Sequence, residues 1–451
     1  MDYLKNTSYI FIPFNFSDPA DFKRLIDEFD KSILLKKTND KILYMLKYVS
    51  DKINSNDKES CQCFHYEVTD YARNELNLAT KDDWFTTKEI VEDGKSKQRE
   101  EEYRFKILSI QLYCFSTTVG IFAFKIYFEK NDPFWISNAQ YYLKKVSREN
   151  ICLDFKDAPC TTMLEISKSI TKKFSHITEM NYFYYANPTT ERANLLTYIE
   201  VAPQESYKKE LYYLKRCYSD GYLYVENEKL DEEQTYIPSN DTVWGISSEA
   251  AVCLACPDMG RGKFLRSTFY ENFNAQYLFM YVLLLHQKYV LYMFLTKIGI
   301  GTYNNLETLE TYRHQLYEFE TDFVFSCITE VPQYQNLYDR MAQAFSLKKM
   351  YEDVHEPLVS LGEIRRETAE NEQKKRDDNV NKALLMLSVL SFFSALVDSF
   401  DFVQSFFGWF LGGIGIKVIQ ICCILGITVT VAFVFKNLFK SKRSSSKKHK
   451  Q

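Results

Sequence analysis

The sequence predicts an α/β cytoplasmic domain, then a long stalk helix and a C-terminal two-helix transmembrane hairpin that assembles into an oligomeric pore. Two stretches near the end, 383–397 and 418–435, run for fifteen and eighteen residues without a charge. These lengths approach the roughly 20 apolar residues that span a bilayer as a helix. The rest of the chain is rich in apolar and aromatic residues, as in a folded domain rather than a disordered chain.

Composition and periodicity divide the chain into seven consecutive parts. They are a cytoplasmic α/β domain (1–267), a helical hairpin (268–333), a stalk helix (334–382), transmembrane helix 1 (383–401), an outer turn (402–417), transmembrane helix 2 (418–435) and a basic tail (436–451).

The cytoplasmic domain mixes strand and helix patterns, which favours two or three layers with mostly antiparallel strands. Strands are expected at 8–14, 62–69, 106–116, 121–128, 196–202, 222–227 and 248–255. Helices are expected near 19–49, 134–147, 161–175 and 205–216.

The stalk is expected to be one long helix that runs into the first membrane span. Apolar residues recur at helical spacing from Met341 to Leu361. Pro357 should kink or interrupt the helix, because it lacks an amide proton and its ring crowds the preceding turn. After Leu361 the segment is polar almost all round, which is typical of a helix that crosses solvent.

A third apolar segment, 276–295, competes with the two predicted spans. His286, Gln287 and Lys288 interrupt it after nine apolar residues, so we interpret it as a buried helix of the cytoplasmic domain. The tail 436–451 holds seven Lys/Arg and no acid, whereas the connection between the spans holds only Lys417. The positive-inside rule then places both termini in the cytoplasm and the protein in the cell's inner (plasma) membrane, with no signal peptide expected.

A polar stripe runs along the first predicted span. Asp377, Asn381, Leu384, Ser388, Ser391, Ala395 and Asp398 are spaced alternately by four and three residues, which places them on one face of a helix. Around a symmetry axis, copies of this stripe would line a passage with a ring of carboxylates at its outer end, and such rings attract cations. The alternative is that the serines only permit close helix packing. We predict a pore lined by Asn381, Leu384, Ser388, Ser391, Ala395, Asp398 and Asp401.

The ligand signals in the cytoplasmic domain are weaker. The loop DMGRGKF (258–264) carries Arg261 and Lys263, which are candidates for holding phosphate, although an ordinary surface turn has the same composition. Trp244 is a candidate for stacking an adenine, with a core position as the alternative. No P-loop, HExxH or nucleophile signature is present, so no enzymatic activity is expected. The eleven scattered cysteines predict reduced thiols rather than a disulfide framework or a metal site.

The chain resembles the CorA family of two-helix divalent-cation transporters. The resemblance rests on the α/β body, the stalk that continues into a membrane helix, the short outer turn and the basic tail. The segment KILSIQLYCFSTTVGIFAFKIYF (106–128) is similar to that family's N-terminal β-hairpin, with a turn at Ser116–Gly120. Further similar segments are WGISSEAAVCLA (244–255), YVLLLHQKYVLYMF (281–294) and FVFSCITEVPQYQNLYDRM (323–341).

One departure from the family changes the expected function. CorA transporters carry Gly-Met-Asn at the outer end of the first membrane helix, and this chain has DSFDFVQSFFGWFLGGIG there. The branch without that triplet includes CorA-like proteins associated with type III CRISPR systems. That resemblance implies a homo-oligomeric antiviral ion channel, a pentamer by family, gated by a nucleotide second messenger. A divalent-cation transporter regulated by cytoplasmic cation and a non-conducting membrane-anchored binding protein are the alternatives. The acidic body does not suggest nucleic-acid binding, and no cofactor is required.

Overall fold

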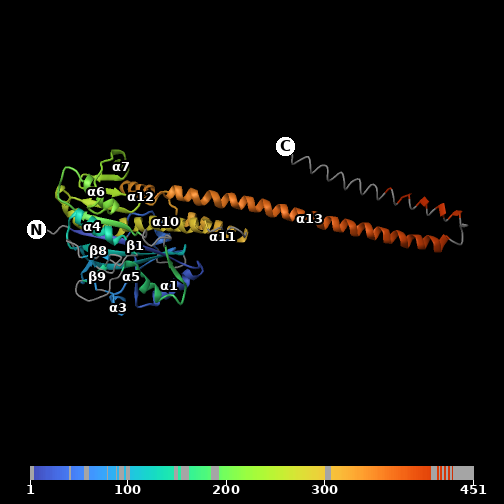
Figure 1. The fold of residues 1–451 in the computed structure, drawn as a ribbon, viewed down its shortest axis with the longest axis horizontal. Helices are drawn as coiled ribbons and strands as arrows, with labels where there is room; N and C mark the ends of the chain where they lie inside the picture. Colours follow the sequence, from blue (N-terminus) through green and yellow to red (C-terminus); the bar gives the residue numbers. More distant parts are fainter. Residues whose placement is uncertain are drawn as a thin grey trace. The chain divides into compact units, whose positions relative to one another are not determined.

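The computed structural model describes the residue ranges 5–39, 42–54, 60–78, 80–87, 89–90, 96–97, 102–146, 151–153, 162–183, 192–299 and 306–407, and isolated residues between 414 and 429. The chain divides into two units, Met1–Gly362 and Glu363–Gln451. The first unit is an α/β sheet domain and the second is helical where described (Figure 1).

A single large sheet organises the first unit. Its main strands lie in the order β12, β13, β14, β11, β1, β8, β7, β3 and β2. In that order their bounds are Thr235–Ser239, Thr242–Ile246, Ala250–Ala255, Asn194–Glu200, Asn6–Phe16, Val119–Phe128, Arg104–Phe115, Cys63–Val68 and Leu35–Thr38. Among the described strand pairs only β11 and β14 run parallel, which confirms the expected antiparallel character.

Short strands complete the sheets. β10 (Met180–Tyr182) pairs with β1, and β4 (Phe85–Thr87) pairs with both β7 and β9 (Ile151–Leu153). β5 (Glu89–Ile90) and β6 (Ser96–Lys97) form a separate two-stranded sheet.

Both faces of the sheet are covered, so the domain has three layers. Along β1, Tyr9 and Phe11 enter one core while Ile10 and Ile12 enter the other, as the two-residue period of a strand requires. The second core includes residues of α1 (Asp21–Lys31), α3 (Asp70–Glu75), α4 (Pro133–Leu143), α5 (Met163–Lys172) and α6 (Lys208–Arg216). The first core includes residues of α2 (Lys47–Ile53) and of the helices from α10 onward.

The β7–β8 hairpin is present where the sequence predicts it. Thr118 closes the turn with a left-handed φ of 73°. Just beyond the turn, Gly120 lies opposite Phe14 of β1, and a Cβ added at Gly120 would meet the Phe14 ring at 2.2 Å. The absent side chain therefore leaves the space that the Phe14 ring fills.

One almost continuous helical run crosses the first core. After η2 (Pro257–Met259) it comprises α8 (Gly262–Phe264), η3 (Leu265–Phe269), α9 (Tyr270–Asn272), η4 (Phe273–Tyr277) and α10 (Leu278–Gly299), and η3 and η4 are π-helical turns. Leu283, Leu284 and Leu285 are fully buried. The segment 276–295 is thus a buried helix, as expected.

Three consecutive polar residues of α10 form hydrogen bonds to neighbouring elements, while the imidazole Nδ1 of His286 has no partner among the described residues. The imidazole Nε2 of His286 lies 2.6 Å from Thr117 Oγ1, and Gln287 Nε2 donates to the carbonyl of Phe323 at 2.6 Å. Lys288 Nζ donates to Asn194 Oδ1 at 3.3 Å. These contacts fix how α10 lies against the sheet, because a buried polar group without its partner is costly.

The expected single stalk helix is divided in two. α12 (Pro332–Ala344) and α13 (Leu347–Phe407) are separated at Ser346, whose φ of 56° is left-handed. Of the two effects expected of Pro357, a kink or an interruption, the interruption does not occur, because α13 passes through it. The carbonyl that loses its helical donor there belongs to Asp353, an exposed residue, so water can take that bond.

Several strand and helix expectations also differ from the structure. The expected helix 19–49 is α1, strand β2 and α2, and the expected strand 222–227 is irregular chain before α7 (Glu228–Glu233). The β12–β13 hairpin was not expected at all. α11 (Leu306–Phe323) follows α10 and precedes α12 (Figure 1).

Candidate functional sites

The predicted pore stripe lies on α13, in the second unit. All seven predicted residues fall within the helix, so their spacing places them along one stripe. Asn381, Leu384, Ser388, Ser391 and Asp398 are exposed, and Ser388 Oγ donates to the carbonyl of Leu384 at 2.9 Å. The side chains of Ala395 and Asp401 lie outside the described ones.

The large apolar side chains around the stripe are exposed as well. Their exposed fractions run from 42% at Phe393 to 68% at Met386, and the set is Met386, Leu387, Leu390, Phe392 and Phe393. Ile414, Val418, Ile421, Leu425 and Val429 are helical and also more than half exposed. A soluble monomer rarely shows so much contiguous apolar surface.

The remaining membrane predictions lie largely outside the described residues. Part of 402–417, most of 418–435 and all of the tail 436–451 fall there, and residues 402–407 continue the helix α13. Among the described helices, one run, Gly262–Ile298, is long and apolar enough to cross a bilayer, and 83% of its most apolar window is buried within the domain. That run is the helix of the first core described above.

The three predicted ligand residues do not converge on one site. Trp244 on β13 is fully buried, with its ring 5.0 Å from that of Tyr277, so no ring face is open to a ligand. Arg261 is half exposed and binds the carboxylate of Asp241, with Nε 2.6 Å from Oδ2. This pairing lowers the pKa of Asp241. Lys263 is exposed on α8.

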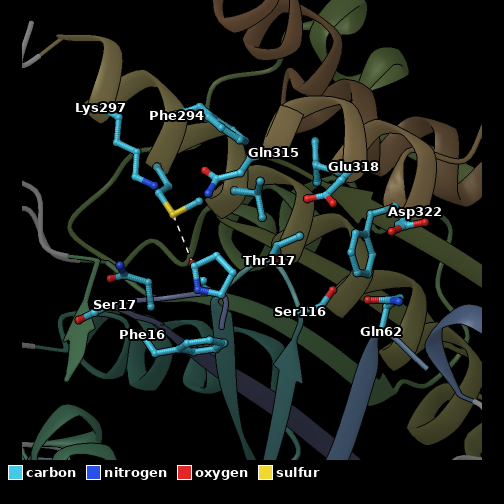
Figure 2. A pocket seen from close by; sticks show the side chains of 17 residues that line it. Phe16, Ser17, Gln62, Ser116, Thr117, Phe294, Lys297, Gln315, Glu318 and Asp322 are labelled. Carbon is cyan, nitrogen blue, oxygen red and sulfur yellow. Dashed lines mark hydrogen bonds between the residues drawn. The ribbon is translucent and has the colours of Figure 1, made fainter. Parts of the chain in front are cut away.

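A cavity of about 300 Å³ lies where α10 and α11 meet the sheet. Figure 2 shows Phe294 and Lys297 of α10 and Gln315, Glu318 and Asp322 of α11 around it. Asp322 is already paired with Lys52 at 2.6 Å. The Lys297 ammonium lies 5.0 Å from the centroid of the Tyr312 ring, and burial lowers its pKa.

A larger cavity, about 830 Å³, lies among α6, α7 and the β12–β13 hairpin. Its charged lining consists of Lys208 and five carboxylates: Glu205, Glu228, Asp231, Glu232 and Asp241. Of these, Asp231 binds Lys215 at 3.2 Å. An acidic lining repels phosphate, so size alone does not make this cavity a nucleotide site.

A third cavity, about 360 Å³, is lined by two arginines. Arg216 ends α6 and Arg340 lies on α12, so 124 positions separate them in sequence. No spacing rule links such distant residues, which is why the sequence analysis missed them. The β13–β14 turn, with Ser248 and Glu249, completes the wall between them.

No family model, curated protein or solved structure matches the chain. Within the described ranges, no group of three or more His, Cys, Asp or Glu side chains is placed to hold a metal ion. The functional argument therefore rests on the residues of this chain.

Proposed function

We propose that this chain is one subunit of a homo-oligomeric ion channel in the plasma membrane, opened by a small ligand that binds the α/β domain. The observation that carries the proposal is the exposed apolar surface of α13, which surrounds a stripe of small and polar side chains. The ligand class proposed from the family resemblance is a nucleotide second messenger. The chain would then serve as a membrane effector of type III CRISPR defence.

The exposed side chains of α13 need an apolar environment. Burial of one Leu, Met or Phe side chain is worth about 1.5–3 kcal/mol, so five such side chains in water represent a large unfavourable free energy. A bilayer removes that penalty along the whole apolar surface. The polar stripe gains nothing from lipid and is best placed against other copies or water.

A pore needs several copies of this helix. One hairpin cannot enclose a passage, so cyclic symmetry with head-to-tail contacts is required, and the resemblance suggests five subunits. In this arrangement Ser388 and Ser391 line the passage and Asp398 forms a carboxylate ring that attracts cations. We propose cytoplasmic termini from the seven basic residues of the tail.

Gating requires only that the ligand distinguish two states. A ligand shifts the closed–open equilibrium by its difference in affinity for the two states. A change from 1% to 99% open needs about 5.5 kcal/mol, which several ligands bound to one oligomer supply together. α13 supports this coupling, because its first turns pack in the domain core through Val354 and Leu358.

The pore assignment is tested by single-channel recording of two stripe variants. Asp398→Asn should lower cation conductance several-fold, because the ring loses its charge, and Ser388→Leu should block the passage. Ser388→Ala and Met386→Leu are the matched controls and should conduct like the wild type. Unchanged currents in both test variants would show that the stripe does not line the pore.

A further inference from the structure

The arginine cavity, defined as the space of about 360 Å³ between Arg216 and Arg340, lies beside the joint between α12 and α13. Its walls come from the end of α6, the end of α7 with the following Gln234, the β13–β14 turn and the last turns of α12. The size suits a small ligand rather than a single ion.

The two guanidinium groups are each held in place by an aromatic ring and by hydrogen bonds. Arg216 stacks over Tyr212 at 4.4 Å and donates from Nη2 to Gln234 Oε1 at 3.2 Å. Its Nη1 is buried and has no hydrogen-bond partner among the described residues. Arg340 lies over Tyr236 at 5.4 Å and donates from Nη1 to the carbonyl of Thr235 at 3.1 Å. Arg216 therefore brings an unsatisfied hydrogen-bond donor to the wall of the cavity.

The carboxylate nearest to these arginines is already neutralised. Glu249 binds Lys144 Nζ at 2.6 Å and Arg192 Nη1 at 2.8 Å. The Lys288 ammonium adds a further positive charge near it, 3.5 Å from the carbonyl oxygen of Ser248. Glu233 is the other acid of the lining. The charged lining of the cavity consists of two arginines and two glutamates, and because Lys144 and Arg192 outside the lining neutralise Glu249, one positive charge of the lining remains uncompensated.

We propose that the arginine cavity binds the phosphate group of a small soluble ligand, with Arg216 and Arg340 as its two charged contacts. Planar guanidinium groups match phosphate oxygens in geometry and keep their charge at every physiological pH. This inference rests on the proposed function, because it assigns the ligand of the proposed channel a chemical class and a binding place in the α/β domain.

The position of the cavity links an occupant to the stalk. Gln343 and Ala344, the last residues before the break, line it together with Arg340. The amide of Ser346 donates to the carbonyl of Gln343 at 2.9 Å, and α13 begins at Leu347. A phosphate drawn between Arg216 and Arg340 therefore acts on the end of α12, less than two turns from the start of α13.

The test is titration calorimetry with pyrophosphate on the full chain, held in nanodiscs of zwitterionic lipid so that no lipid anion competes. Arg216→Gln and Arg340→Gln should each weaken binding at least tenfold, as the loss of a charge-assisted contact predicts. Arg104→Gln is the matched control: Arg104 is a partly exposed arginine on β7, paired with Glu129, and its loss should change the affinity less than twofold. Wild-type affinity should also fall as salt rises.

Hydrogen exchange on the wild type keeps the inference testable if a variant misfolds. Pyrophosphate should slow amide exchange at 216–218, 247–249 and 340–347 and leave the β7–β8 hairpin unchanged. Equal binding by all four proteins, no binding by the wild type at 10 mM, or protection elsewhere would overturn the proposal. Because none of these readouts needs ion flux, a channel that fails to conduct would leave a positive binding result standing.

Discussion

His286 is a fully buried imidazole whose surroundings favour the neutral form. Its ring stacks on Phe115 with centroids 3.9 Å apart, and its Nε2 contacts Thr117 Oγ1. Burial lowers the pKa of His286 well below its ordinary value. The histidine thus stays uncharged in the native state at pH values where an unfolded chain would protonate it.

The buried neutral His286 should make the free energy of unfolding fall at acidic pH, and His286→Gln should remove this contribution. Below about pH 6.5 the unfolded chain binds a proton that native His286 does not, so stability falls as pH falls, by up to about 1.4 kcal/mol per pH unit. Urea unfolding should therefore show a smaller loss of stability between pH 7.5 and 5.5 in His286→Gln than in the wild type. His314→Gln, at an exposed position on α11, is the control and should keep the wild-type difference.

Gly120 is the second residue whose identity the packing requires. The Phe14 ring occupies the place of its missing side chain, so Gly120→Ala should destabilise the domain by about 1–3 kcal/mol through overpacking. Gly221→Ala is the matched control, because its nearest neighbour, Ser219 Oγ, would lie at 3.7 Å. Equal urea midpoints for the two variants would show that the β1–β8 contact relaxes freely.

The joint between α12 and α13 is the element on which the proposed gating depends. Ser346 takes a left-handed conformation, and Phe345 beside it packs on Tyr281 with ring centroids 5.5 Å apart. The joint is therefore anchored to α10 while the backbone turns between the two helices. An anchored joint is suited to pass a displacement of α12 to α13.

Substitutions of Ser346 should show whether the joint requires its left-handed backbone conformation. Ser346→Val should destabilise the first unit by about 1–2 kcal/mol, because a β-branched residue is disfavoured at positive φ. Ser346→Gly should stay within about 0.5 kcal/mol of the wild type. Equal losses in urea unfolding for both variants would mean that the serine side chain matters and the backbone conformation does not.

The sequence predicts the strong periodic elements and misses those that tertiary contacts define. Apolar and aromatic segments predict strands at β1, β7, β8 and β14, and the alternating spacing of four and three residues predicts the helix of the stripe. The break at Ser346 carried no glycine to mark it. Strand β2, with the sequence LKKT, has no alternation that would separate it from the helices on either side.

The candidate sites also differ in whether local spacing or tertiary contacts bring their residues together. The stripe on α13 is local, so spacing alone brings its residues to one face. Arg216 and Arg340 come together only through the docking of α12 near the end of α6, which no sequence pattern reports. Trp244 was proposed as a stacking residue, yet its neighbours Phe273 and Tyr277 belong to the helical run across the first core.

At the scale of the whole molecule, the two units differ in whether their apolar side chains are buried. The first unit buries them on both faces of its sheet, whereas the described part of the second leaves them exposed along α13. A folded domain joined by one helix to an exposed apolar segment is the organisation that the proposed ligand-gated channel requires.

The most direct test is cation flux from liposomes that contain the purified full chain, measured with and without the nucleotide products of an activated type III CRISPR complex. The account predicts flux that appears only with those products and that Ser388→Leu abolishes. Flux without any nucleotide, suppressed by millimolar magnesium, would instead identify a cation-regulated transporter. An absence of flux under every condition would leave a membrane-anchored binding protein and contradict the channel.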